Sequence, residues 1–226
     1  MILATHATVD GARAMMGDIV KTSADNAIFE IDLLAPSPIE RIEIRNGLEL
    51  IETFRPFERD ALGKRIRVVW EGSEYRGRGR ETIWDGKATL RGNAVARIDP
   101  INFYNLDKRV AATSPSQLEW QALTTGGHGG FDAWLSDARS GTLDIETKLV
   151  QCSVPIEEIG LDDTVFDAGG LRRRLRIFRL PDENPHRKVR LRRTIPLRNA
   201  GDNALYVRVT TEDGHVAWSS PIYLYR

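Results

Sequence analysis

The fold class is decided by the stretch Ala27-Ile28-Phe29-Glu30-Ile31-Asp32-Leu33-Leu34. Apolar residues occupy every second position from Phe29 to Leu33, and acidic residues occupy the positions between them. In an extended strand successive side chains point to opposite faces, so this stretch has one dry face and one wet face. The pattern therefore predicts a strand of a half-buried β-sheet.

The same alternation continues along the chain. The run Ile39–Arg45 is followed by Asn46-Gly47, the strongest short signal for a β-hairpin, and Leu48–Phe54 then reads as the returning strand. Further strands are expected at Arg65–Trp70, Thr82–Trp84, Leu118–Leu123, Leu143–Leu149, Arg172–Phe178, Val189–Ile195, Ala204–Thr210 and Ala217–Tyr225.

Turn residues separate these runs at short intervals, for example Asp85-Gly86, Ser140-Gly141 and Asp213-Gly214. An antiparallel sandwich or barrel needs such regular turns, whereas a βαβ fold would need helical patterns between its strands. Only Glu58–Leu62 and Pro155–Leu161 are compatible with short helices. The sequence therefore predicts an all-β fold, an antiparallel β-sandwich of jelly-roll or immunoglobulin-like type with one or two short helices.

The length of 226 residues allows one large domain or two small ones. Hydrophobic residues make up 41% of the chain and charged residues 28%, a composition that suits a globular protein and argues against disorder. No internal repeat and no Pro-, Ser- or Gly-rich linker divides the sequence. We therefore expect a single β-sandwich domain over residues 1–226.

Charge is balanced over the whole chain, with 32 basic and 32 acidic residues, which argues against a nucleic-acid or acidic-membrane partner. The local balance is different. The segment Leu171–Arg193 has ten basic residues and two acidic ones, while Pro155–Asp167 has five acidic residues and no basic one. One interpretation is that strands facing water pair with an acidic loop.

The other interpretation of the basic segment is an anion-binding face. On an extended strand Arg172, Arg174 and Arg176 project to the same side, where their planar guanidinium groups could hold a phosphate or a carboxylate. Phe178 is the single aromatic residue within the arginine-rich run Arg172–Arg179. A stacking platform for single-stranded nucleic acid needs several aromatic residues among the basic ones, so it is not expected here.

Cysteine usage and hydropathy bear on the compartment. Cys152 is the single cysteine, so an intrachain disulfide is excluded, and its strand-like surroundings indicate a buried structural thiol rather than a nucleophile. The first residues do not have the pattern of a signal peptide, and nowhere do 18 apolar residues run together. We expect a cytoplasmic protein with no membrane partner.

Motifs for metal binding and catalysis are not visible. No histidine has a partner at a metal-binding spacing, and the chain has neither a Gly-x-Ser-x-Gly elbow nor a Walker-type phosphate loop. The sequence therefore predicts no catalytic residue, no metal site and no cofactor. The four histidines are His6, His128, His186 and His215.

The glycine-rich segment Thr124–Asp132 surrounds His128 with four glycines. Glycines allow the backbone to approach a ligand closely, and they equally serve a tight crossing between strands. Exposed aromatic residues would add a sugar-binding surface, although tryptophans are also typical of a buried core. The aromatic candidates for such a surface are Trp70, Tyr75, Trp84 and Trp134.

The segment Glu212–His215 also has two interpretations. Asp213-Gly214 is a good two-residue hairpin turn between the strands Ala204–Thr210 and Ala217–Tyr225, with His215 as a surface residue beside it. Alternatively, His128, Asp213 and His215 are candidate ligand-binding residues. Hydrolase activity on this chain alone would require these three side chains and Glu212 to lie close together.

Several phrases of the sequence resemble the C-terminal part of the bacterial family DUF3604. The most specific one is Tyr206–Tyr223, which contains Thr-Glu-Asp-Gly-His-Val-Ala-Trp-Ser-Ser-Pro. The similarity spans essentially the whole chain. Its supporting phrases are Ala4–Arg13, Trp70-Glu71-Gly72, Tyr75–Arg80, Trp84-Asp85-Gly86, Asn105-Leu106-Asp107 and Thr124–Gly127.

Full-length members of that family resemble metal-dependent hydrolases of the PHP type, whose His and Asp ligands lie in a distorted α/β barrel upstream of the matching segment. The resemblance implies that this chain corresponds to the β-rich region without the barrel, with residues 1–20 as the barrel's tail. It implies a truncated or split protein, or an accessory, non-catalytic chain whose partner is a PHP-like barrel domain or chain. Apart from the resemblance, a homo-oligomer is a further expectation, in which self-association covers the exposed face. The alternative is an independent module that binds an anionic or carbohydrate ligand.

Overall fold

The computed structural model describes residues 1–78, 80–105 and 107–226. Gly79 of the Tyr75–Arg80 phrase and Leu106 of the Asn105–Asp107 phrase lie outside the described residues. In the part of the chain that is described, no helix has the length and apolar character needed to cross a membrane.

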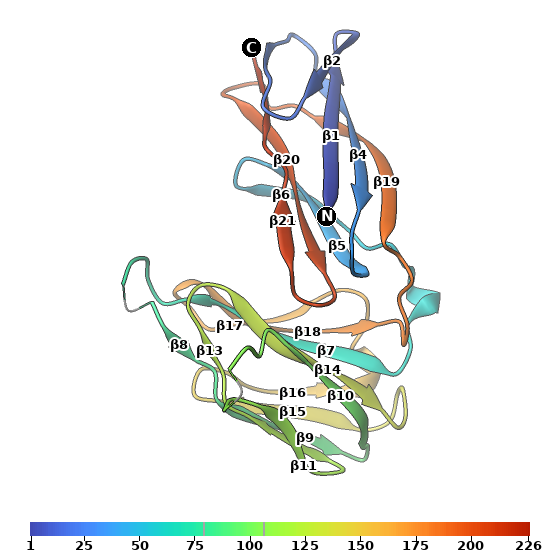
Figure 1. Ribbon diagram of the computed structural model, residues 1–226, viewed down its shortest axis with the longest axis vertical. Coiled ribbons are helices and arrows are strands. Elements are labelled where there is room, and N and C mark those ends of the chain that lie inside the picture. The colour runs from blue at the N-terminus through green and yellow to red at the C-terminus, as the bar shows by residue number, and fades with distance from the viewer. Residues whose placement is uncertain (79, 106) are drawn as a thin grey trace. The chain divides into compact units, whose positions relative to one another are not determined.

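The all-β fold class is confirmed (Figure 1). Strands pair antiparallel throughout the described sheets, apart from one short parallel pair between β3 (Ile19–Lys21) and β22 (Ile222–Tyr225). The two expected short helices are single 3₁₀ turns, η1 (Arg59–Ala61) and η2 (Ile156–Glu158). Each lies inside the segment in which the sequence predicts a helix.

The chain divides into two compact units. Unit 1 consists of Met1–Phe57 and Asn184–Arg226, and unit 2 is Glu58–Glu183, inserted between these two halves. The sequence predicts one sandwich over residues 1–226, whereas the structure has a separate hydrophobic core in each unit. The chain passes from unit 1 to unit 2 next to Pro56 and returns to unit 1 next to Pro185.

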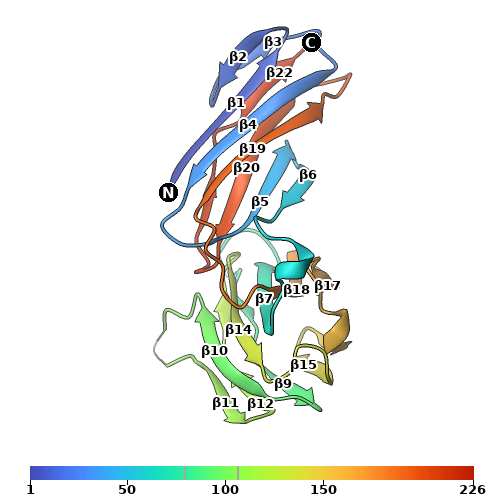
Figure 2. The same cartoon turned by 90° about the vertical axis from the view of Figure 1, so that its right-hand side faces the viewer.

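Unit 1 is built from two sheets whose inner faces share one core (Figure 2). The four-stranded sheet has the order β19 (Lys188–Pro196), β4 (Asn26–Leu34), β1 (Ile2–Val9) and β2 (Ala12–Met15). The larger sheet has the order β3, β22, β20 (Asn203–Thr211), β5 (Ile39–Asn46) and β6 (Glu49–Phe54), and β21 (Val216–Trp218) also pairs with β20.

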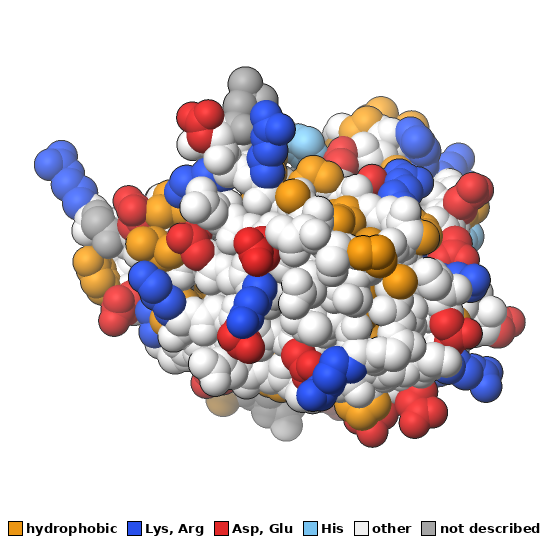
Figure 3. All heavy atoms as spheres, turned by 90° about the horizontal axis from the view of Figure 1, so that it is seen from below, with side chains coloured by type: hydrophobic (Ala, Val, Ile, Leu, Met, Phe, Trp, Pro, Cys, Tyr) orange, Lys and Arg blue, Asp and Glu red, His pale blue; other side chains and the backbone are white. Residues whose placement is uncertain are grey.

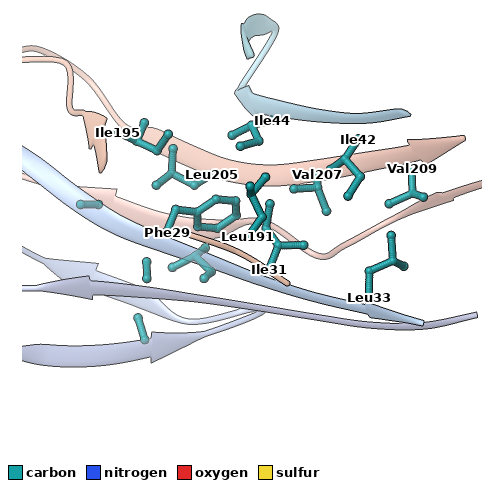
Figure 4. Packing of buried hydrophobic residues seen from close by; sticks show 14 of the residues in the cluster. Phe29, Ile31, Leu33, Ile42, Ile44, Leu191, Ile195, Leu205, Val207 and Val209 are labelled. Atoms are coloured by element: carbon teal, nitrogen blue, oxygen red, sulfur yellow. The ribbon is translucent and has the colours of Figure 1, made fainter. Parts of the chain in front are cut away.

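The core of unit 1 confirms the alternation that predicts β4. Phe29, Ile31 and Leu33 are all at most 2% exposed and point toward the strands of the opposite sheet (Figure 4). There they meet the apolar faces of β5 and β20, including Ile42 and Val207. The acidic residues of β4 lie on its outer face, as the period of two requires.

The hairpin at Asn46-Gly47 forms one residue later than its sequence suggests. Asn46 pairs with Glu49, so the two loop residues are Gly47 and Leu48, and Gly47 has the positive φ of 59° that favours glycine. Asn46 itself is buried at the end of β5. Its side chain donates a hydrogen bond to Oδ1 of Asn203 at 2.8 Å and accepts one from the backbone N–H of Ala204 at 3.0 Å. The asparagine therefore joins β5 to β20.

Unit 2 also consists of two facing sheets, with a third pair of short strands. The first sheet has the order β10 (Val95–Ile101), β14 (His128–Leu135), β7 (Arg65–Ser73), β18 (Leu171–Leu180) and β17 (Thr164–Asp167). The second has the order β11 (Val110–Ser114), β12 (Gln117–Trp120), β9 (Gly86–Arg91), β15 (Thr142–Thr147) and β16 (Gln151–Pro155), and the short pair is β13 (Leu123–Thr124) with β8 (Thr82–Ile83).

Stacked tryptophans occupy the core of unit 2. Trp70 of β7 and Trp120 of β12 lie nearly parallel, with ring centroids 5.2 Å apart and an interplanar angle of 7°. Trp84 is also fully buried and donates its Nε1–H to Oγ1 of Thr124 at 3.0 Å. The interpretation of Trp70 and Trp84 as core residues is therefore confirmed.

We expect a polypeptide of residues 58–183 to fold without unit 1. Its core lies within these residues, and its ends are already joined, since the backbone N–H of Gly63 donates to the carbonyl oxygen of Leu180 at 3.1 Å. Dispersed amide signals in an NMR spectrum, together with one cooperative unfolding transition, would confirm this. A disordered spectrum for 58–183 would show instead that unit 2 depends on unit 1.

Candidate ligand-binding site

A cavity of about 230 Å³ opens in unit 2 beside Trp70 of β7. Three other segments form its walls: the connection after β10, the connection between β12 and β13, and the first residues of β14. The cavity is lined by Trp70, Asn102, Phe103, Tyr104, Asn105, Lys108, Gln121, Ala122, Leu123, His128 and Gly129.

Trp70 contributes a buried hydrogen-bond donor to this cavity. Its side chain is 0% exposed, and its Nε1–H has no hydrogen-bond partner among the described residues. A Cβ atom at Gly129 would lie 2.9 Å from that nitrogen, so the missing side chain of the glycine leaves room for the indole at this point. Because an unpaired buried donor costs about 1–3 kcal/mol, a ligand that supplies an acceptor here gains that amount in return.

Asn102 ties the loop after β10 to the start of β14. It has a φ of 59°, a left-handed conformation that asparagine tolerates better than most residues. Its Nδ2 donates to the carbonyl oxygen of His128 at 3.0 Å and lies 3.3 Å from Nε2 of the same histidine. The hydroxyl of Tyr104 in turn donates to Oδ1 of Asn102 at 2.6 Å, which holds a ring that is 79% exposed at the border of the cavity.

The charge of this cavity distinguishes it from two other hollows of the molecule. None of its lining residues is acidic, and Lys108 forms no ion pair within the described residues. The hollow over β1, β4 and β19 contains Glu30 and Asp32, and the one over β9, β12 and β15 contains Glu119 and Glu146. Acidic and basic side chains are interspersed over the face displayed in Figure 3.

The side chains of the cavity are suited to binding a ring with polar substituents. Trp70, Phe103 and Tyr104 supply apolar surface, while Asn102 and Gln121 supply amide groups. Among the described residues, no three His, Cys, Asp or Glu side chains gather as a metal ion would require. The chemistry offered by this site is therefore hydrogen bonding and ring packing.

Glycines in the segment Thr124–Asp132 serve the packing of β14 on β7. A Cβ atom at Gly130 would lie 2.2 Å from the carbonyl oxygen of Val68, so only glycine fits at this point of the sheet. The tight strand crossing is thus confirmed for Gly130. The second interpretation, close approach to a ligand, applies to Gly129 and His128, which line the cavity.

Two of the three arginines predicted as an anion-binding face, Arg174 and Arg176, are held by acidic groups of the chain itself. A register shift in β18 separates Arg172, which has a φ of 54°, from the regular alternation that follows. Nε of Arg174 lies 2.5 Å from Oε1 of Glu71, and Nη1 of Arg176 lies 2.7 Å from Oδ2 of Asp163. Asp163 belongs to the acidic segment that the first interpretation pairs with these strands.

Of the predicted ligand-binding residues, the structure brings Asp213 and His215 together in unit 1, and His128 belongs to unit 2. Nδ1 of His215 lies 3.2 Å from Oδ1 of Asp213, and the hydroxyl of Thr211 donates to the same oxygen at 2.5 Å. The hydroxyl of Ser37 donates to the other carboxylate oxygen. Asp213 therefore holds the turn between β20 and β21 in place.

Cys152 is half-buried on β16, and burial raises the pKa of its thiol to about 11. At neutral pH the group is therefore protonated, and a protonated thiol is a poor nucleophile.

The cavity residues Asn102, Tyr104 and Lys108 are not singled out by the sequence. The signal that could have found the first two is Asn102-Phe103-Tyr104-Asn105, where two amide side chains flank two aromatic ones just after a strand that contains Pro100. Comparison with known proteins finds no matching family model, no matching curated protein and no matching solved structure. The function is therefore inferred from the side chains of the cavity.

The pKa of Asp213 yields a prediction. Burial raises it, but hydrogen bonds from Ser37, Thr211 and His215 outweigh burial and lower the pKa from 3.8 to about 2. Because the folded-state pKa is depressed, the carboxylate stabilises the turn fully above the ordinary pKa and loses this effect as the pH falls toward 2. A pH titration of the Asp213 carboxyl carbon by NMR should give a midpoint near 2, and the Ser37→Ala variant should raise it. A wild-type midpoint near 4 would contradict the role of Asp213 in holding the turn between β20 and β21.

Proposed function

We propose that the chain is a non-catalytic ligand-binding protein whose unit 2 binds a small, hydroxyl-rich ligand in the cavity beside Trp70. The observation that carries this proposal is the buried Nε1–H of Trp70, a residue of the cavity lining, which has no hydrogen-bond partner among the described residues. Buried polar groups without partners are rare in native proteins, and a bound acceptor satisfies this one. This function is the second of the two that the sequence leaves open, an independent module that binds an anionic or carbohydrate ligand.

The size and lining of the cavity limit the ligand. A volume of about 230 Å³ is below the range of about 300–1,000 Å³ typical of sites for drug-sized molecules, so the ligand has roughly the size of one substituted ring. Phe103 and Tyr104 offer faces on which such a ring packs, and the amide of Gln121 binds its hydroxyl groups. A monosaccharide meets both requirements.

The proposal is tested by titrating the protein with D-glucose, D-galactose, D-glucuronate and inorganic phosphate. The chain has five tryptophans, and we expect the indole N–H signal of Trp70 to shift in NMR spectra as a sugar-type compound binds. Trp70→Phe assigns the signal. Tyr104→Ala should weaken binding because it removes a ring at the border of the cavity, whereas Tyr75→Ala, on another loop of unit 2, should leave it unchanged.

The outcome that contradicts this function is equally clear. If no compound of the panel shifts the Trp70 signal at millimolar concentration, the cavity does not bind ligands of this class. A shift that Tyr104→Ala and Tyr75→Ala alter equally would place the ligand elsewhere on unit 2.

A second candidate function, an accessory role beside a PHP-like barrel as the family resemblance implies, is favoured by the outer face of the sheet β19-β4-β1-β2. This face has a hollow of about 600 Å³ with charges of both signs, bordered by Ile2 and Leu34, which are 68% and 47% exposed. Mixed polar and apolar surfaces of this kind are typical of contacts between domains. We propose that a barrel domain or chain, or a second copy, covers it in a cytoplasmic protein.

Light scattering tests this second proposal on the protein alone. We expect a mass above 25.4 kDa at high protein concentration, because a second copy covers the face when no barrel is present. Leu34→Glu should restore the monomer, whereas Leu48→Glu, at a loop residue of unit 1 that is 87% exposed, should not. A monomer at every concentration would contradict self-association through this face.

A further inference from the structure

We infer that the ligand of the unit 2 cavity is a sugar acid, a single sugar ring whose carboxylate is bound by Lys108. This inference rests on the proposed binding function and adds the chemical class of the ligand. It combines three features of the cavity: a half-buried lysine, the lack of acidic lining residues, and aromatic walls.

The lysine is the first feature. Lys108 is half-buried, lines the cavity and forms no ion pair within the described residues. Two other cations of unit 2 are paired with acids on neighbouring strands: Nζ of Lys87 lies 2.9 Å from Glu146, and Nη2 of Arg91 lies 2.9 Å from Asp144. Water solvates an exposed ammonium group, but a partly buried one is stabilised by an anion in hydrogen-bond reach.

The second feature is the sign of the remaining charge. Because no lining residue is acidic, a ligand carboxylate meets no like charge in the cavity, and a cationic ligand meets Lys108 without any compensating group. Asp107, the neighbour of Lys108 in the chain, lines the adjacent hollow together with Arg109. The electrostatics of the cavity thus select against cations and favour a monoanion.

The third feature separates a sugar acid from an inorganic anion. Trp70, Phe103 and Leu123 form apolar wall, which phosphate cannot cover, whereas one face of a sugar ring packs on it. The unpaired N–H of Trp70 then donates to a hydroxyl or ring oxygen, an acceptor that a simple aromatic carboxylate lacks on its ring. Only a ring that bears both hydroxyl groups and a carboxylate uses every part of the site.

The test compares charged and neutral sugars on the full chain by calorimetry and by the Trp70 indole signal. D-glucuronate and D-galacturonate should bind about tenfold or more tightly than D-glucose and D-galactose, because the Lys108 contact is charge-assisted. Lys108→Gln should reduce glucuronate affinity to that of glucose, while the indole signal still shifts. The matched control is Lys148→Gln, an exposed lysine of unit 2 outside the cavity, which should keep the full preference.

Each other outcome overturns a defined part of the inference. If neutral sugars bind as tightly as uronates and Lys108→Gln has no effect, the carboxylate assignment is wrong, and the proposed binding function stands. Tighter binding of inorganic phosphate or benzoate than of uronates would replace the sugar acid by a different anion. Failure of every compound to shift the Trp70 signal would overturn the proposed function itself.

Discussion

The stacking of Trp70 on Trp120 is the contact on which unit 2 and its cavity depend. Trp70 lies on β7 and Trp120 on β12, so the pair joins the two sheets through the middle of the core, and Phe131 of β14 packs against both rings. A buried aromatic ring of this size contributes about 3–5 kcal/mol to stability. That contribution exceeds the cost of about 1–3 kcal/mol for leaving one indole N–H unpaired, so the fold tolerates a free donor at the cavity.

Pairing of opposite charges explains how a chain of zero net charge folds around strongly charged segments. Arg190 contacts Asp32 at 3.1 Å and Arg193 contacts Glu52 at 2.8 Å, each across neighbouring strands or sheets of unit 1. In unit 2, Arg174 and Arg176 share Glu71. All three of these carboxylates lie outside the acidic segment 155–167, so the basic strands find partners that are distant in the sequence. Lys108 differs from these arginines because it is half-buried in a cavity whose lining has no acidic residue, and the proposed role of its charge is to bind a ligand.

Period-two alternation predicts about half of the strands and which side of β4 is buried, because only an extended backbone turns that pattern into one apolar face. Strands that lack a clear alternation, such as β9 and β10, were not predicted, and two further features differ from the prediction. The predicted strand Ala217–Tyr225 is interrupted before Ile222, where Pro221 lacks the N–H that a ladder needs. The strand β14 is not among the predicted strands because its glycines disfavour strands, yet Gly130 is what allows it to lie against β7. The division into units was not predictable from composition. Unit 2 is inserted into unit 1, and no Pro-, Ser- or Gly-rich tract marks either junction in the sequence.

The candidate site was predictable only in part, for a physical reason. His128 and its glycines stand out locally, but Asn102 and Lys108 join them only when four separate segments fold together. Gly129 shows how closely the fold and the site are linked. A side chain there would press on Nε1 of Trp70, so the residue that gives β14 its place beside the tryptophan also leaves room for the indole. The packing that builds the core thus leaves this donor without a partner among the described residues, and the proposed ligand would satisfy it.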